Sequence, residues 1–174
     1  ITLAEKYGVS KSPIRDALQR LEFEGLVEIA PRQCHRTAPI SISDANDILD
    51  LRETLEAAAV RRIAADASSY KLGELDFFRT ANLSSLKDFS LYNNNFHSKI
   101  NKLSGNQRHS EIMRSLMDNY ERLCIISLSS RRQEAKAMNA ALEDHNQIID
   151  ALQSRDGRLA ARLSVKHIKK SHVQ

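Results

Sequence analysis

The 174-residue sequence contains no Trp, and aromatic residues make up only 5% of it. It also has only five Gly and three Pro, while long stretches are rich in alanine and other aliphatic residues. This composition argues against a β-sandwich or a barrel and favours helices.

Cysteines and long apolar runs are also scarce. Cys34 and Cys124 lie far apart and form no CxxC pair, which fits reduced thiols in a cytosolic protein better than a disulfide framework. No run approaches the roughly 18 apolar residues of a membrane span, and no signal peptide is visible. We therefore expect a cytoplasmic protein that makes no contact with a membrane.

The charge is moderately basic. The formal net charge is +4 and the sequence pI is about 9.2. These values are compatible with nucleic-acid binding but do not establish it, since many basic proteins bind none. The length allows one large domain or two small ones, so the position of the charge matters more than its total.

The first 25 residues predict two short helices. Thr2 and Glu5 form a capping-box pattern, and Gly8 suits the end of the first helix because glycine readily adopts a positive φ. Ser10 is a suitable N-cap for the second helix, and Pro13 falls in its first turn. Apolar residues then recur at helical spacing and predict a buried stripe, formed by Ile14, Ala17, Leu18 and Leu21. Two helices joined around a glycine predict a helix-turn-helix.

The periodicity then changes to that of strands. Residues 26–30 have the alternating pattern that is typical of a strand. Residues 31–33 can form a turn, and residues 34–38 can form a second strand that returns beside the first. A helix-turn-helix followed by a hairpin is a winged helix. Because residues 39–43 have the composition of a connector, we predict a winged helix-turn-helix domain at 1–40 and a second domain at 41–174.

The second domain is predicted to be all helical. Ser43 is expected to cap a long helix, and further helices are expected at 71–79, 83–103, 107–130, 132–154 and 156–172. The segments 104–106 and 155–157 contain Gly and act as breaks. The sequence therefore predicts a mostly α protein whose C-terminal part is an antiparallel bundle of about six helices.

The second helix carries polar side chains opposite its apolar stripe. Lys11, Arg15 and Gln19 are four residues apart and project from one face, next to Ser12. Cations suit phosphates, and Arg or Gln can bond base edges in pairs in the major groove. The positive surface is extended by Arg20 and, in the hairpin, by Arg32, His35 and Arg36. The alternative is a solvated helix face, but the adjoining helix, turn and hairpin favour DNA.

The segment LAEKYGVSKSPIRDALQRLEFEGLVEIAP resembles the DNA-binding domain of the GntR superfamily. Its V-S-[RK]-x-P-[VI]-R-[ED]-A-L core is matched from Val9 to Leu18, and the resemblance implies that Lys11 and Arg15 contact DNA. Cys34 stands where the family's wing usually carries Gly. The helix that precedes this segment in the family is missing, so we expect further residues before Ile1.

Three histidines occupy three different predicted helices. His97, His145 and His167 are far apart in the sequence, and Asn93 precedes His97 by four residues, so these two share a face. A bundle can bring such residues together on a metal, and imidazole suits Zn, Ni, Cu or Fe. Spacing alone does not show that the helices meet, and a single histidine in such a position is more often a surface residue or a satisfied core residue than a ligand.

The region from about residue 44 to the end resembles the FCD ligand-binding domain, found in the FadR-like branch of the GntR superfamily. The motifs that carry the resemblance are DLRETLE at 50–56, FHSKINKLSGN at 96–106, EDHNQIIDAL at 143–152, and His167. In many members an Asp four residues before the first His joins three His around a divalent metal. The residues at those positions here are Asn93, His97, His145 and His167.

Asn93 replaces the usual Asp, and a neutral amide oxygen is a weaker donor than a carboxylate. The resemblance therefore implies a looser site that still holds a divalent transition metal, foremost Zn or Ni. The other three histidines match no ligand position and are expected at the surface; they are His35, His109 and His172.

Metal-binding members of this family commonly sense small organic acids, so the resemblance implies a small carboxylate effector. A cation at the base of a cavity would neutralise such an anion. Arg52 falls in the family's R-x-x-x-E pattern with Glu56 and is a candidate second partner of the effector. Its alternative role is an i,i+4 salt bridge on the helix surface.

These features predict a homodimeric, metabolite-responsive transcriptional regulator rather than an enzyme. Two winged helices related by a two-fold axis would bind a palindromic operator in double-stranded DNA. A repressor that is released by its ligand is the commoner case in the family.

Three alternatives remain open. The effector pocket can function without a metal, or the bundle can be inert, with the histidines serving only packing. A His-ligated metalloenzyme is the third alternative. Against it, the only neighbouring candidates for a general base are Glu143 and Asp144, and a place on the helix surface explains both.

Overall fold

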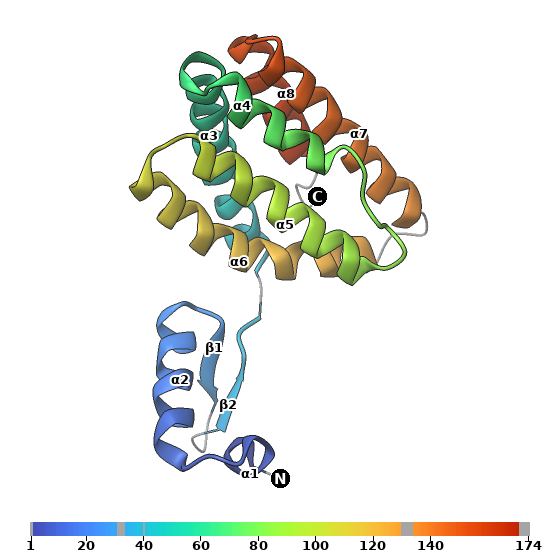
Figure 1. The fold of residues 1–174 in the computed structure, drawn as a ribbon. Helices are drawn as coiled ribbons and strands as arrows, with labels where there is room; N and C mark the ends of the chain where they lie inside the picture. The colour runs from blue at the N-terminus through green and yellow to red at the C-terminus, as the bar shows by residue number, and fades with distance from the viewer. Residues whose placement is uncertain (1, 31–33, 40, 130–133, 171–174) are drawn as a thin grey trace. The chain divides into compact units, whose positions relative to one another are not determined.

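The computed structural model describes residues 2–30, 34–39, 41–129 and 134–170. The chain divides into two compact units, Ile1–Ile40 and Ser41–Gln174. The predicted fold class is confirmed, because the described residues are mostly helical and include one small antiparallel sheet (Figure 1). None of the described helices is both long and apolar enough to cross a membrane.

The N-terminal unit is a helix-turn-helix followed by a hairpin. Its elements are α1 (Leu3–Tyr7), α2 (Lys11–Phe23), β1 (Val27–Ala30) and β2 (Cys34–Thr37), and the strands pair antiparallel from Val27↔Thr37 to Ala30↔Cys34. The predicted capping box is present, since Glu5 N–H donates to Thr2 Oγ1 and Thr2 N–H donates to Glu5 Oε2. Gly8 ends α1 with φ of 64°. Ser10 occupies the N-cap of α2, but its side chain makes no capping hydrogen bond.

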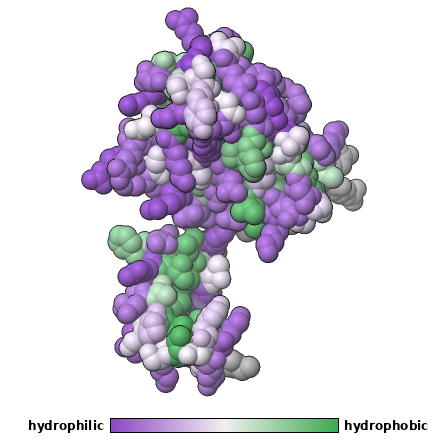
Figure 2. Space-filling model, in the orientation of Figure 1, coloured by the Kyte–Doolittle hydropathy of each residue, from purple (hydrophilic) through white to green (hydrophobic). Residues whose placement is uncertain are grey.

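The apolar stripe of α2 is less buried than the sequence predicts. Ile14, Leu18 and Leu21 are half-buried, and Ala17 is exposed. Large apolar side chains are exposed elsewhere on this unit, as the apolar surface in Figure 2 illustrates; they are Leu3, Tyr7, Val9, Phe23 and Ile29. The physical reason is size, because two helices and a hairpin are too small to enclose a core.

The second unit contains six α-helices among its described residues. They are α3 (Ile42–Asp66), α4 (Ser69–Gly73), α5 (Leu86–Leu103), α6 (Gln107–Ser129), α7 (Glu134–Gln153) and α8 (Gly157–Lys169), with a 3-10 helix, η1 (Glu74–Phe78), after α4. The helix α3 packs mainly against α8, α5 packs against α6, and α7 packs against α8. The prediction that Ser43 caps α3 is wrong. Ser41 is the cap, because its hydroxyl accepts a hydrogen bond from Asp44 N–H and the helix begins at Ile42.

A close approach between α3 and α8 sets the position of α8. Gly157 begins α8, and a Cβ atom there would lie 3.2 Å from Ala64 Cβ and 3.3 Å from Arg61 Cα. The Asp156 side chain caps the helix by accepting a hydrogen bond from Leu159 N–H. Because α8 lies directly on α3, the inward side chains of α8 reach the centre of the bundle.

Candidate functional site

Three histidines from three helices meet in the interior of the second unit. His97 on α5 and His145 on α7 are fully buried, and His167 on α8 is 5% exposed. Each offers a ring nitrogen, and the three nitrogens lie within 4.8 Å of one another. His145 also stacks on Phe96, with ring centroids 4.0 Å apart. The packing of α5, α7 and α8 thus makes one cluster from residues that are distant in the sequence.

Two of these histidines donate Nδ1–H to carboxylates, one buried and one half-buried. His97 Nδ1 lies 2.9 Å from Glu56 Oε2, and His167 Nδ1 lies 3.3 Å from Asp144 Oδ2. Burial by itself would raise the pKa of Glu56, but the charge of Arg52, the influence of His97 and the hydrogen bonds from both together outweigh it and hold that pKa well below its usual range. Burial likewise opposes ionisation of Asp144, yet the hydrogen bond with His167 helps to lower its pKa. Ionised carboxylates only accept, so both rings carry a proton on Nδ1, and the neutral form of each ring has its lone pair on Nε2.

The tautomer of His145 is set by Tyr92. The Tyr92 hydroxyl donates to the carbonyl oxygen of Phe78 at 3.0 Å, so toward His145 Nδ1, 2.9 Å away, it acts as an acceptor. The Nε2 atom of His145 therefore also has a lone pair. Burial lowers the pKa of His145 well below 6.5 and that of His97 to about 4, so both rings are neutral near pH 7.

The three Nε2 atoms then have the arrangement of metal ligands. The Nε2 atoms of His145 and His167 are 3.2 Å apart, and His97 Nε2 is buried with no hydrogen-bond partner among the described residues. When all three rings are neutral with their protons on Nδ1, the lone pairs of His145 and His167 face each other without a donor between them. A cation would satisfy all three nitrogens, and neutral imidazoles with bonded Nδ1 atoms are typical ligands of transition metals. The cluster is therefore a candidate metal site.

Asn93 lies on α5 four residues before His97 and is 4% exposed. Residues at this spacing share a helix face. The ligand cluster described above consists of the three histidines alone, so coordination by Asn93 stays a prediction.

Arg52 forms the i,i+4 ion pair with Glu56, with Nε 2.7 Å from Oε1. The expectation that this pair lies on the helix surface is wrong, because Arg52 is 0% and Glu56 1% exposed. The inner face of α3 packs against α5, α6 and α8, which encloses both residues. The guanidinium lies 4.1 Å from the ring centre of Tyr120, and its Nη1 and Nη2 atoms are buried without a hydrogen-bond partner. Neither of these two nitrogens therefore has an acceptor among the described residues.

The other three histidines were predicted to lie at the surface, and this prediction is confirmed for only one of them. His35 on β2 is exposed, and His172 lies outside the described residues. The prediction for His109 is wrong, because it is buried and its Nε2 lies 2.8 Å from Asn101 Oδ1. Asn101 in turn donates to the carbonyl oxygen of His97 at 2.7 Å. His109 therefore joins α6 to α5 near the cluster.

Sequence reasoning missed the groups that orient the ring nitrogens. Glu56 was considered only as a partner of Arg52, Tyr92 was not singled out, and Asp144 was assigned to the helix surface although its side chain is only 14% exposed. The one available signal was adjacency, since Tyr92 and Asp144 directly precede Asn93 and His145. No spacing rule predicts such partners, because all three pairs join different helices that are far apart in the sequence.

Tyr92→Phe should weaken metal binding by about 10- to 100-fold, which is typical of losing a group that orients a ligand. The substitution removes the acceptor of His145 Nδ1–H and keeps the aromatic ring. Competition with a chromogenic chelator measures the affinity. Tyr70→Phe, on an exposed tyrosine of α4, is the control. Equal affinities in the two variants would refute the role of Tyr92.

The predicted DNA-reading side chains lie on α2 of the N-terminal unit. Lys11, Ser12, Arg15 and Gln19 are all exposed. Arg32 lies outside the described residues, and Arg36 on β2 is 2.5 Å from Glu28, which offsets its charge. The face that carries Arg15 is therefore accessible to a duplex.

A winged helix-turn-helix joined to a helical unit with a buried histidine cluster defines a class of protein, the ligand-responsive DNA-binding regulators. The family model described as "FCD domain" matches residues 47–170, and the model "Bacterial regulatory proteins, gntR family" matches residues 2–35. The chain therefore belongs to the FCD-domain members of the GntR family of bacterial transcriptional regulators. It is a DNA-binding transcriptional regulator and not an enzyme.

Similar proteins agree with this assignment. The chain is 26% identical over 168 residues to the HTH-type transcriptional repressor RspR of Escherichia coli K12, covering 94% of this chain and 72% of that protein. It is 25% identical to the HTH-type transcriptional repressor GlaR of the same organism, and the match covers 95% of this chain and 80% of that protein.

Solved structures share the fold. Escherichia coli McbR/YncC matches with a TM-score of 0.77 at 20% identity, covering 97% of this chain and 81% of that one. A GntR transcriptional regulator from Rhodococcus sp. RHA1 matches with a TM-score of 0.80 at 19% identity, covering 98% and 82%.

Proposed function

We propose that this regulator senses a small organic acid through a divalent metal held by His97, His145 and His167. The observation that carries the proposal is that a ring nitrogen of each histidine lies within 4.8 Å of the other two, while each Nδ1 lies within hydrogen-bonding distance of another side chain. Residues 41–174 would form the sensing domain and residues 1–40 the DNA-reading domain. The alternative is an effector pocket that binds its ligand without a metal.

Zn or Ni suits this donor set best, since neutral imidazoles bind both. The bound ion would supply positive charge for a carboxylate. Elemental analysis of the purified protein, without added metal or chelator, tests this directly. About one transition-metal ion per chain is expected. A metal-free protein that stays so after dialysis against Zn would refute the site and favour the metal-free pocket.

Asn93 is proposed as the fourth, neutral ligand. Asn93→Asp should tighten metal binding by at least about 10-fold, because a carboxylate adds a negative charge beside the cation. Chelator competition measures the change. Asn94→Asp, one residue further along α5, adds the same charge as a control. If Asn93→Asp leaves the affinity unchanged, Asn93 does not face the ion.

Arg52 is proposed as the second partner of the acid, because its Nη1 and Nη2 atoms are buried and have no hydrogen-bond partner among the described residues. Glu56 connects the two anchoring points, since it accepts from both Arg52 and His97. An acid with two oxygen-bearing groups, such as a hydroxy acid, could reach both.

Arg52→Lys should weaken binding of citrate, used as a probe, by at least about 10-fold without changing metal affinity. Lysine keeps the positive charge beside Glu56 but loses the planar pair of Nη donors. Calorimetric titration of the metal-loaded protein measures the effect. Arg62→Lys, on the exposed face of α3, is the matched control. Unchanged citrate affinity in the Arg52 variant would remove Arg52 from the effector site.

On DNA, we propose a homodimer in the cytoplasm that binds a palindromic operator and acts as a repressor. The names of RspR and GlaR as repressors support the sign of regulation. Coupling is reciprocal, so an acid that weakens DNA binding must bind less tightly to the DNA complex. Citrate titrated into the operator complex, with and without chelator, separates a metal-dependent response from a metal-free one.

A further inference from the structure

A basic groove lies between α3 and α8. Its volume is about 510 Å³, and its floor includes Ala161, which is buried, and Val165, which is half-buried. The other lining residues are all basic and exposed; they are Arg61, Arg162, Lys166, Lys169 and Lys170. None of the three clustered histidines lines this groove.

The positive charge of the groove is only partly compensated. Lys169 lies 3.8 Å from Glu53, and Lys170 lies 2.6 Å from an oxygen of Asp144. The other three, Arg61, Arg162 and Lys166, form no ion pair within the part of the chain that the structure describes. This excess of positive charge is therefore available to an anion.

Helix stability explains only part of this charge. Cations at the C-terminal end of a helix favour its dipole, which accounts for Lys166 and Lys169 in the last turn and for Lys170 at the C-cap. Arg162 lies in the middle of α8 and Arg61 lies on α3, so neither gains from a helix terminus. Arg162 and Lys166 are four residues apart, and like charges at this spacing destabilise a helix. An anion bound between them would relieve that repulsion.

We propose that the groove binds a phosphorylated small molecule with an apolar part, of about the size of a nucleoside diphosphate. Arg61 and Arg162 would approach its phosphates from the two helices, because guanidinium groups bind phosphate oxygens in pairs. Lys166 would add a point charge. Ala161 and Val165 would cover the apolar part. This site goes beyond the proposed acid sensor and needs no metal.

The groove fits a small molecule better than a DNA backbone, although both present phosphates. Its volume falls in the range of about 300–1,000 Å³ that is usual for small-ligand sites. An apolar floor between the cations offers nothing to the sugar–phosphate backbone of a duplex, whereas it can bury a base.

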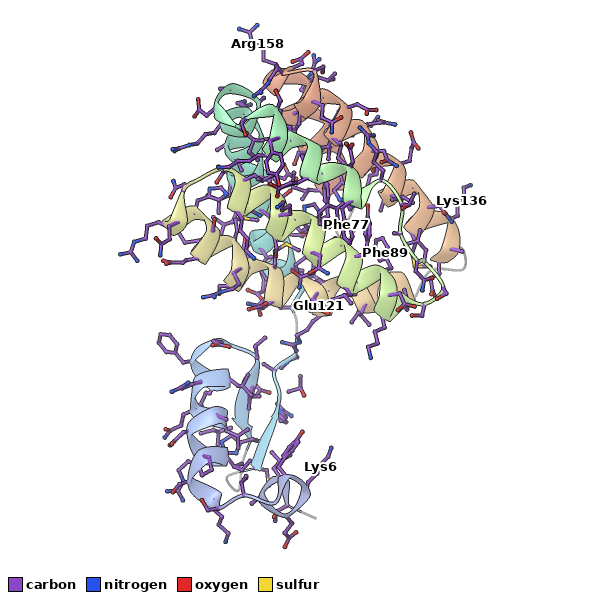
Figure 3. The ribbon with its side chains drawn as sticks, in the orientation of Figure 1. Lys6, Phe77, Phe89, Glu121, Lys136 and Arg158 are labelled. Carbon is purple, nitrogen blue, oxygen red and sulfur yellow. The ribbon has the colours of Figure 1, made fainter. Side chains whose placement is uncertain are left out.

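Calorimetric titration of the full chain with ADP, in EDTA and without divalent ions, tests the proposal. One ADP per chain should bind, and the triple variant Arg61→Gln, Arg162→Gln, Lys166→Gln should weaken it at least 10-fold. A matched variant removes three exposed charges outside the groove, Lys71→Gln, Lys87→Gln and Lys136→Gln, and should bind like the parent. Figure 3 shows Lys136 near the start of α7 and Arg158 at the other end of the α7–α8 pair.

The chemistry of the ligand is tested with two fragments. Adenosine should bind far more weakly than ADP, and pyrophosphate should bind several-fold more weakly. No ADP binding up to millimolar concentration, or equal losses in both triple variants, would overturn the proposal. So would a groove variant that loses only DNA affinity, because that result assigns the groove to the duplex. Since EDTA is present throughout, failure of the metal site cannot produce any of these results.

Discussion

Replacing His145 by alanine is expected to lower metal affinity more than about 100-fold, so that metal is lost on purification. His145 sits at the centre of the cluster, with Nε2 3.2 Å from that of His167. Losing an orienting group alone commonly costs about 10- to 100-fold, and losing the ligand itself must cost more. Elemental analysis and chelator competition measure the change.

The same variant should lose its metal-dependent stability. A metal at 100 times its dissociation constant stabilises the native state by about 2.7 kcal/mol, or roughly 5–10 °C for a chain of this size. His145 is fully buried and stacks on Phe96, so its removal also leaves a cavity. The informative quantity is therefore the difference in Tm with and without chelator, which should vanish.

The exposed His35 provides the control for this experiment. His35→Ala should keep both the metal and the Tm difference. His145→Gln fills most of the cavity and should behave like His145→Ala toward metal while losing less intrinsic stability. An unchanged metal stoichiometry in both His145 variants would disprove the site.

Arg15→Ala is expected to abolish specific DNA binding while the helical bundle stays folded. Arg15 is exposed on α2, the helix predicted to enter the major groove. A bidentate contact between Arg and a base is worth about 1–3 kcal/mol, or roughly 5- to 150-fold per half-site. A dimer would lose this contact energy in both half-sites.

Fluorescence anisotropy at fixed salt, with an operator selected from random duplexes and with a scrambled duplex, measures the specificity ratio. Lys136→Ala removes the same charge from the other unit and should keep that ratio. Circular dichroism should show equal helix content in all three proteins. If Arg15→Ala keeps the parent's specificity ratio, α2 is not the reading helix.

Local patterns in the sequence predicted most of the fold. The helices of the bundle fall close to the predicted ranges, because apolar periodicity and N-caps act within a few residues. Where a prediction was wrong, either a tertiary contact or a competing residue nearby in the sequence determined the observed structure. Ser41 rather than Ser43 caps α3, and His109 is buried because α6 packs on α5.

The candidate site divides in the same way. The family resemblance already singled out His97, His145 and His167, but no spacing rule shows that their ring nitrogens come within 4.8 Å of one another. The burial of Arg52 also depends on the surrounding helices, whereas the sequence favoured a surface salt bridge over an effector contact.

The sequence by itself determined that this protein is a helical DNA-binding regulator and which residue types it can offer to DNA and to a metal. Only the tertiary structure decided which of them act together. Glu56, Tyr92 and Asp144 set the tautomers of the three histidines, and each does so through one hydrogen bond. Such bonds depend on the packing of whole helices against one another, and that information is absent from any local stretch of sequence.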